Sequence, residues 1–174
     1  MPFANITINP TVDTAAYAAG DVVFNLTAIE LPAKKCRLLS VTAYDKGSTP
    51  GTTDADSIAL FFFRNNVADL GTLNATANIS VADFESNLLL GTCKLTCEHD
   101  VLNAEVDNVK FLFGHNTATA ITAAESTNLN VVLEGSTSNT NGVGNTCFVG
   151  GIQFAGTSDF VAASDLKIVL SVEY

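Results

Sequence analysis

Length, composition and charge set the first limits on this chain. Its 174 residues, of which 47% are hydrophobic and 15% charged, fit one domain with a single sizeable core. A net charge of −10 disfavours binding to nucleic-acid phosphates or anionic lipid headgroups, so we expect neither nucleic acid nor a membrane as a partner.

No targeting segment is visible in the sequence. No apolar run approaches the ~18–20 residues that a transmembrane helix needs, and the first residues lack the basic and apolar regions of a secretory signal. We therefore expect the protein to be made and folded in a cytoplasm. Under those conditions its four cysteines would be reduced and buried, with disulfides forming only after exposure to oxidising conditions. These cysteines are Cys36, Cys93, Cys97 and Cys147.

The N-terminal segment predicts a short edge strand. Phe3 to Asn9 alternates between polar and apolar positions, and Pro10 ends the run. We expect residues 1–10 to form an N-terminal strand or arm and residues 11–174 to form a single β-sandwich domain. A second short strand is expected over Val22–Leu26, followed by a connection over Thr27–Lys35.

The stretch from Arg37 to Asn65 predicts two strands joined as a hairpin. The first alternates until Asp45, and the turn-rich segment from Lys46 to Ser57 follows it. Ile58–Phe63 then has no polar side, so this strand should be buried on both faces or lie under a covering segment.

The clearest helix signal lies over Asn78–Gly91. Ser80 can cap it, Asp83 follows three residues later near the positive end of the helix dipole, and Gly91 can supply a left-handed stop. Apolar residues fall on one stripe, so the helix should lie on a sheet edge or close one end of a sandwich. The stripe comprises Val81, Phe84, Leu88 and Leu89.

Most of the remaining chain predicts short strands. Gly150-Gly151 indicates a bulge or a close backbone approach within the strand around it, and Gly135–Asn145 predicts an exposed, mobile loop. With one short helix at about 80–90, this pattern predicts an all-β, antiparallel sandwich of jelly-roll type. The expected strands cover Thr92–His99, Val109–Phe113, Leu129–Leu133, Cys147–Phe154 and Leu166–Tyr174.

One cluster has the residue types of a metal site. Cys93, Cys97 and His99 occupy alternate positions of an expected strand and would share one face, where a further cysteine could join them. The four-residue step between the cysteines suits a structural zinc knuckle poorly, and buried thiols explain the pattern equally well. Both interpretations stay open at this point.

Other polar groups give weaker signals. Asp54 and Asp56 resemble part of a calcium loop but lack its central Gly and terminal Glu. His99 and His115 have no nucleophile motif beside them. We therefore expect a protein that is not an enzyme, with no catalytic residues and no cofactor.

Five short blocks in order resemble the capsid decoration, or cement, proteins of tailed bacteriophages. Together they span most of the chain. The blocks are Thr11–Asp21, Leu39–Lys46, Ser57–Phe63, Asn78–Phe84 with the Leu90-Gly91 that follows, and Ser164–Val172.

This resemblance implies a jelly-roll sandwich on the outside of a phage head. It would bind the major capsid protein, associate with itself, often as trimers, and stabilise the lattice. The four cysteines, and long loops after Tyr44 and Glu134, depart from the family pattern. Two alternatives remain: a receptor-binding or fibre-associated module in which Gly135–Asn145 contacts a host glycan, and a metal-binding enzyme built on Cys93, Cys97 and His99.

Overall fold

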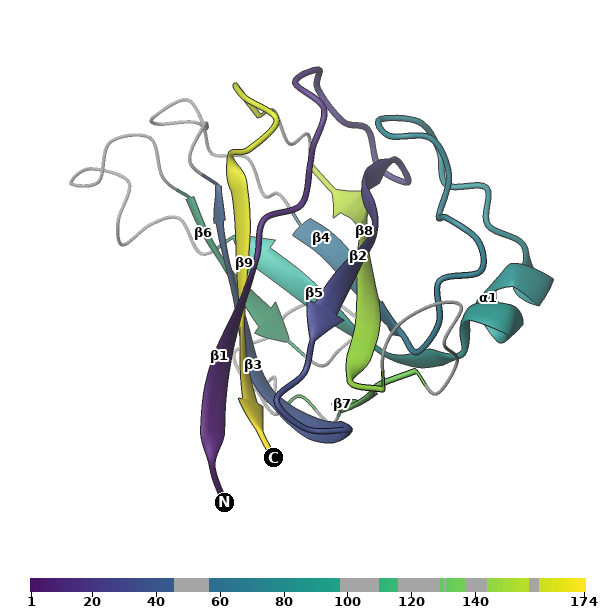
Figure 1. Cartoon of the computed structure of the whole chain (residues 1–174). Coiled ribbons are helices and arrows are strands. Elements are labelled where there is room, and N and C mark those ends of the chain that lie inside the picture. The colour runs from purple at the N-terminus through teal and green to yellow at the C-terminus, as the bar shows by residue number, and fades with distance from the viewer. Residues whose placement is uncertain (46–56, 98–109, 116–128, 130, 137–143, 157–159) are drawn as a thin grey trace.

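The computed structural model shows an all-β molecule with one short helix (Figure 1). It describes residues 1–45, 57–97, 110–115, 129, 131–136, 144–156 and 160–174, with the side chains of 97 and 110–115 left out. The described elements are β1 (Phe3–Ile8), β2 (Val22–Glu30), β3 (Lys35–Asp45), β4 (Ser57–Phe63), α1 (Val81–Asn87), β5 (Leu89–Cys97), β6 (Lys110–His115), β7 (Val131–Glu134), β8 (Thr146–Ala155) and β9 (Leu166–Glu173).

The strand order is that of a jelly roll. One sheet has the order β1-β9-β3-β6 and the other β2-β8-β4-β5, and all pairs are antiparallel. Each sheet therefore interleaves early and late strands, as two nested Greek keys require. Pairing of β5 with β6 joins the two sheets along one side. The predicted antiparallel sandwich of jelly-roll type is confirmed.

The predicted hairpin between the two central strands is wrong. β3 pairs with β9, β6 and the short β7, whereas β4 pairs with β5 and β8. The two strands therefore lie in different sheets. Two consecutive alternating strands form a hairpin in many folds. The same sequence pattern is also found where a Greek-key connection places the two strands in different sheets.

The core lies between the sheets and follows the strand alternation. In β9 every second residue is buried, namely Leu166, Ile168, Leu170 and Val172. β4 is covered on both sides, as predicted: Leu60 and Phe62 lie in the main core, and Phe63 belongs to a second cluster beyond the sheet. β2 continues four residues further than predicted and buries Ile29 within the strand.

Helix α1 covers the outer face of the β2-β8-β4-β5 sheet. Phe84 packs edge-on against Phe61 and tilted against Phe63, with ring centroids 5.8 and 5.4 Å apart. Ser80 and Asp83 form a reciprocal capping box at its start, as the sequence predicts. The predicted stop at Gly91 is wrong, because the helix ends at Asn87 and Leu88 adopts the left-handed conformation.

The buried Asn87 explains this early end. Its amide oxygen accepts from the backbone N–H groups of Val67 and Ala68, at 2.7 and 3.1 Å, and its amide nitrogen donates to the Ala68 carbonyl. The side chain thus fastens the segment after β4 to the end of the helix.

Among the described residues, no helix is long and apolar enough to cross a bilayer.

The described connections at one end of the sandwich carry acidic side chains. β1, β3, β5 and β8 run toward one end, away from the two termini (Figure 1). The described parts of the connections that join strands there are residues 9–21, 156 and 160–165, and they contain three acidic residues and no Lys or Arg. These acidic residues are Asp13, Asp21 and Asp165.

Candidate interaction surface

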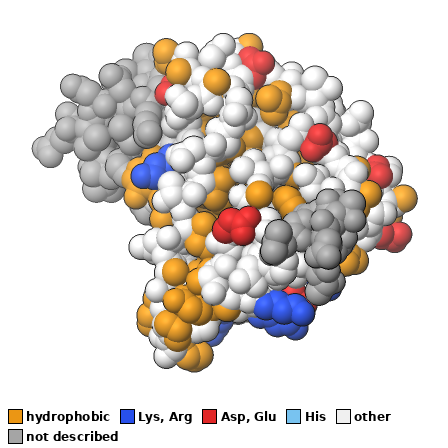
Figure 2. All heavy atoms as spheres, viewed as in Figure 1, with side chains coloured by type: hydrophobic (Ala, Val, Ile, Leu, Met, Phe, Trp, Pro, Cys, Tyr) orange, Lys and Arg blue, Asp and Glu red, His pale blue; other side chains and the backbone are white. Residues whose placement is uncertain are grey.

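The end of the sandwich that carries both chain termini has an exposed apolar patch. Met1, Phe3 and Tyr174 are 88%, 68% and 40% exposed, and we call them the terminal apolar patch. β1 and β9 are neighbours, with Phe3 opposite Glu173, which brings the three side chains to the same end. Figure 2 shows hydrophobic side chains gathered at this lower end, where Figure 1 places the two termini. The sequence signal for it was Phe3, an aromatic residue on the polar side of an alternating strand.

The backbone of β1 has one side turned away from its own sheet. The N–H of Tyr174 donates to the carbonyl of Pro2 at 3.1 Å, so the Pro2–Tyr174 position is a hydrogen-bonded site of the antiparallel ladder. Such sites alternate along an antiparallel pair. The N–H and C=O groups of Phe3, Asn5 and Thr7 therefore point away from β9, toward the outer edge.

That outer edge of β1 is open. Among the described residues, no strand pairs with it, since β9 is the only strand in the register of β1. The side chains of Phe3, Asn5 and Thr7 are also exposed. β1 thus presents unpaired backbone groups to the surroundings.

The opposite edge, at β2, is covered by the chain itself. Val22 N–H donates to the Ala75 carbonyl, and the Val22 carbonyl accepts from Asn74. Further along, the Asn25 side chain donates to the Gly71 carbonyl and accepts from Leu70 N–H. β2 also carries two register shifts, whereas β1 has none. Only one of these two sheet edges is therefore available to another chain.

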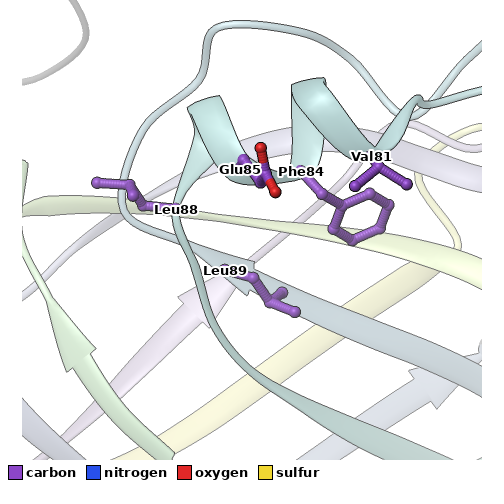
Figure 3. Close-up of a pocket in the computed structure, with 5 residues that line it drawn as sticks. All are labelled: Val81, Phe84, Glu85, Leu88 and Leu89. Atoms are coloured by element: carbon purple, nitrogen blue, oxygen red, sulfur yellow. The ribbon is translucent and has the colours of Figure 1, made fainter.

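A second apolar feature lies beside α1. Val81, Phe84, Glu85, Leu88 and Leu89 line an open pocket of about 410 Å³. Figure 3 shows Phe84 and Val81 on the helix side of this pocket and Leu89 below them on β5. Apart from Glu85 the lining is apolar, and its wide mouth suits contact with another surface better than enclosure of a small molecule.

Leu88 occupies a costly backbone conformation at the edge of this pocket. Its φ is 57° and its ψ is 81°, and its side chain is 46% exposed. A non-glycine residue in the left-handed region costs ~1–2 kcal/mol, and here no compensating full burial of the side chain is gained. The sequence stripe correctly placed four of the lining residues together but assigned the left-handed position to Gly91.

The predicted metal cluster falls largely outside the described residues. Cys93 is buried in β5 opposite Leu60. Cys97 ends the same strand, but its side chain and all of His99 lie outside the part described. Within that part, no group of three or more His, Cys, Asp or Glu residues could hold a metal ion. The metal hypothesis built on Cys93, Cys97 and His99 therefore stays a prediction.

The other predicted polar sites share this outcome. Asp54 and Asp56, His99 and most of Gly135–Asn145 lie outside the described residues, and the side chain of His115 in β6 is also outside them.

Two buried thiols approach each other between the sheets. Cys36 lies in β3 and Cys147 in β8, and both belong to the main core. Burial raises the pKa of the Cys147 thiol to about 12, and the negative charges that Cys36 and Glu30 would carry add to the shift. Burial also raises the pKa of Cys36. Thiols held neutral in this way are poor nucleophiles and poor metal ligands at neutral pH.

Comparison with known proteins adds no relative. No protein-family model matches the chain, and no curated protein matches it either.

Proposed function

We propose that this protein is a virion structural protein, a capsid decoration protein that binds the outside of a phage head and stabilises its lattice. The jelly-roll strand order supports this proposal, because it is the fold that the resemblance of the five sequence blocks implies. The partner would be the major capsid protein, and the same contact would be repeated over many copies of the lattice.

The terminal apolar patch is the observation that carries the proposal. It lies at the end of the sandwich opposite the connections that carry Asp13, Asp21 and Asp165. A molecule with an apolar patch at one end and carboxylates at the other can bury the first against a protein surface and keep the second in solvent. The net charge of −10 would help to keep decorated particles dispersed.

The exposed side chains of the patch allow an estimate of the binding free energy that their burial would contribute. Full burial of an aromatic side chain such as Phe3 is worth roughly 1.5–3 kcal/mol. A single molecule would therefore gain a modest affinity from the patch, and occupancy of the lattice would depend on the remaining interface and on contacts between neighbouring copies.

Co-sedimentation with capsids tests this proposal. The wild-type protein is expected to pellet with capsids assembled from its proposed partner, the major capsid protein, and Phe3→Ser should reduce the bound fraction severalfold. Val161→Ser is the matched control, because Val161 is 74% exposed and precedes β9 at the opposite end. Wild-type protein that stays in the supernatant would contradict the decoration role, and equal loss in both variants would contradict the role of the patch.

A further inference from the structure

Within the described residues, the open edge of β1 lacks four features that often protect an exposed strand. Natural sheet edges are shielded by charged side chains, proline, bulges or a covering segment. β1 has the sequence FANITI, without a charge or a proline, and its register with β9 is continuous over all six residues. β2 at the other edge has both a covering segment and bulges. This difference between the two edge strands indicates that β1 is suited to pair with a strand of another chain.

The pattern of β1 is complementary to itself. Two copies in antiparallel orientation can exchange hydrogen bonds only through the residues whose backbone groups point outward, which are Phe3, Asn5 and Thr7. The register that uses all three places Asn5 opposite Asn5 of the second copy and Phe3 opposite its Thr7. It forms about six backbone hydrogen bonds, two for each such pair.

The side chains fit the same register. On the face toward the core, Ala4 and Ile6 are partly buried against the main core, and the register sets the small Ala4 beside the large Ile6 of the second copy. On the outer face, the two Asn5 amides meet at the two-fold axis. The Asn5 amide oxygen already accepts from the Ser171 hydroxyl at 2.8 Å, and this bond holds the oxygen toward β9.

The distribution of charge also favours contact between two copies along β1. A chain with a net charge of −10 repels its own copies over most of its surface. The segment from Met1 to Val12 contains no charged side chain, and Asp13 is the first acidic residue of the sequence. Two copies can therefore meet along β1 without facing carboxylates within the strand.

We propose that β1 pairs with β1 of a second copy of this chain, giving a two-fold dimer with one continuous eight-stranded sheet. The contact is isologous and therefore closes on itself, so it cannot extend into a fibre. The strand is short, and the dimer is expected to be weak, populated at micromolar to millimolar concentration. This inference does not rest on the proposed function. In the two-fold dimer the terminal apolar patches of the two copies lie at opposite ends, so the inference concerns the free protein, and its symmetry differs from the trimers that the family resemblance implies.

Mass measurement with an edge variant tests the pairing. The wild-type protein at roughly 200 µM should show a species of about 36 kDa by light scattering, twice the 18.2 kDa of one chain. Thr7→Pro removes an outward N–H that β9 does not use, and it should weaken dimerisation at least about tenfold. Thr7→Ala is the control, since it retains the N–H and should dimerise like the wild type. Circular dichroism and thermal melting would establish that Thr7→Pro is folded.

A charge exchange at the two-fold axis gives a test that does not depend on proline. Asn5→Lys and Asn5→Asp should each be monomeric at low salt, because like charges meet at the axis, and a mixture of the two should form a mixed dimer. A wild-type protein that is monomeric or trimeric at this concentration would overturn the inference. A dimer that persists unchanged in Thr7→Pro, or variants at Asn5 that fail to recover on mixing, would overturn it as well.

Discussion

Gly151 is expected to tolerate no larger residue, because the ring of Phe24 occupies the space where a side chain would lie. A Cβ added to Gly151 would fall 2.3 Å from Cε1 and 2.8 Å from Cδ1 of Phe24. Phe24 is only 1% exposed and belongs to the main core, so its ring has little room to turn. The close backbone approach predicted from the Gly150-Gly151 pair is confirmed by this contact.

The cost of Gly151→Ala follows from two opposing effects. Overpacking a well-filled core costs ~1–3 kcal/mol, whereas replacing a glycine reduces the entropy of the unfolded chain and returns ~0.4–1 kcal/mol. A net loss of about 1–2 kcal/mol in the free energy of unfolding is therefore expected. For a chain of this size that loss lowers the melting temperature by roughly 2–8 °C.

Urea and thermal unfolding followed by circular dichroism would measure the effect. Gly150→Ala is the comparison variant, since its nearest obstacles are the ends of the aliphatic Leu70 and Leu26 side chains, at 2.5 and 3.1 Å, and not an aromatic ring. It should lose less stability than Gly151→Ala. In a double-mutant cycle, Phe24→Leu should reduce the cost of Gly151→Ala. A Gly151→Ala protein as stable as the wild type, or fully additive effects with Phe24→Leu, would refute the steric argument.

Two further predictions concern Cys147 and Leu88. Because the folded state keeps the Cys147 thiol protonated up to a pKa of about 12, while the unfolded chain releases that proton above about pH 9, stability should fall as pH rises from 9 toward 12. By pH 10 the loss in the free energy of unfolding should reach about 1 kcal/mol. Urea unfolding at pH 8 and 10 should show a smaller loss between these two pH values for Cys147→Ala than for the wild type. Equal losses in the two proteins would contradict the role of Cys147. Leu88→Gly and Leu88→Asn should each stabilise the fold by up to about 1 kcal/mol, since both residues accept the left-handed conformation, and a loss of stability in both variants would show that the Leu88 side chain compensates for its backbone strain.

Local alternation was enough to place most strands of this fold. Every second residue of β9 enters the core, as the sequence Leu166 to Glu173 indicates. The all-apolar run of β4 correctly indicated burial on both faces, because a second cluster around Phe63 and the helix covers its outer side. These features depend on period-two patterning, which a single sequence displays directly.

The sequence patterns did not predict the features that depend on contacts between residues distant in sequence. The hairpin expected between β3 and β4 is absent, because alternation says which face is buried but not which strand lies alongside. The helix ended three residues early because the buried Asn87 bonds to Val67 and Ala68, and no local rule reveals those bonds. Gly91 instead lies in β5, where an added Cβ would approach Val131.

For the candidate interaction surface too, the sequence showed the local patterns but not the contacts between distant strands. The sequence identified the strand at Phe3–Asn9 and the apolar stripe of α1, both of which are local patterns. It could not show that Phe3 and Tyr174 meet at one end, because that contact depends on the pairing of the first strand with the last. The direction of the outward backbone groups required the single hydrogen bond between Tyr174 and Pro2.

The neighbouring position of β1 and β9 also has a consequence for synthesis. β1 is translated long before β9, so it finds its partner only after Leu166–Glu173 have been made. Contacts of this sequence separation make folding slow and leave incomplete chains open to misassembly. A nascent polypeptide would therefore hold β1 without its pairing strand until β9 has been made, and a transcript truncated before Leu166 would yield a product that cannot complete the sheet.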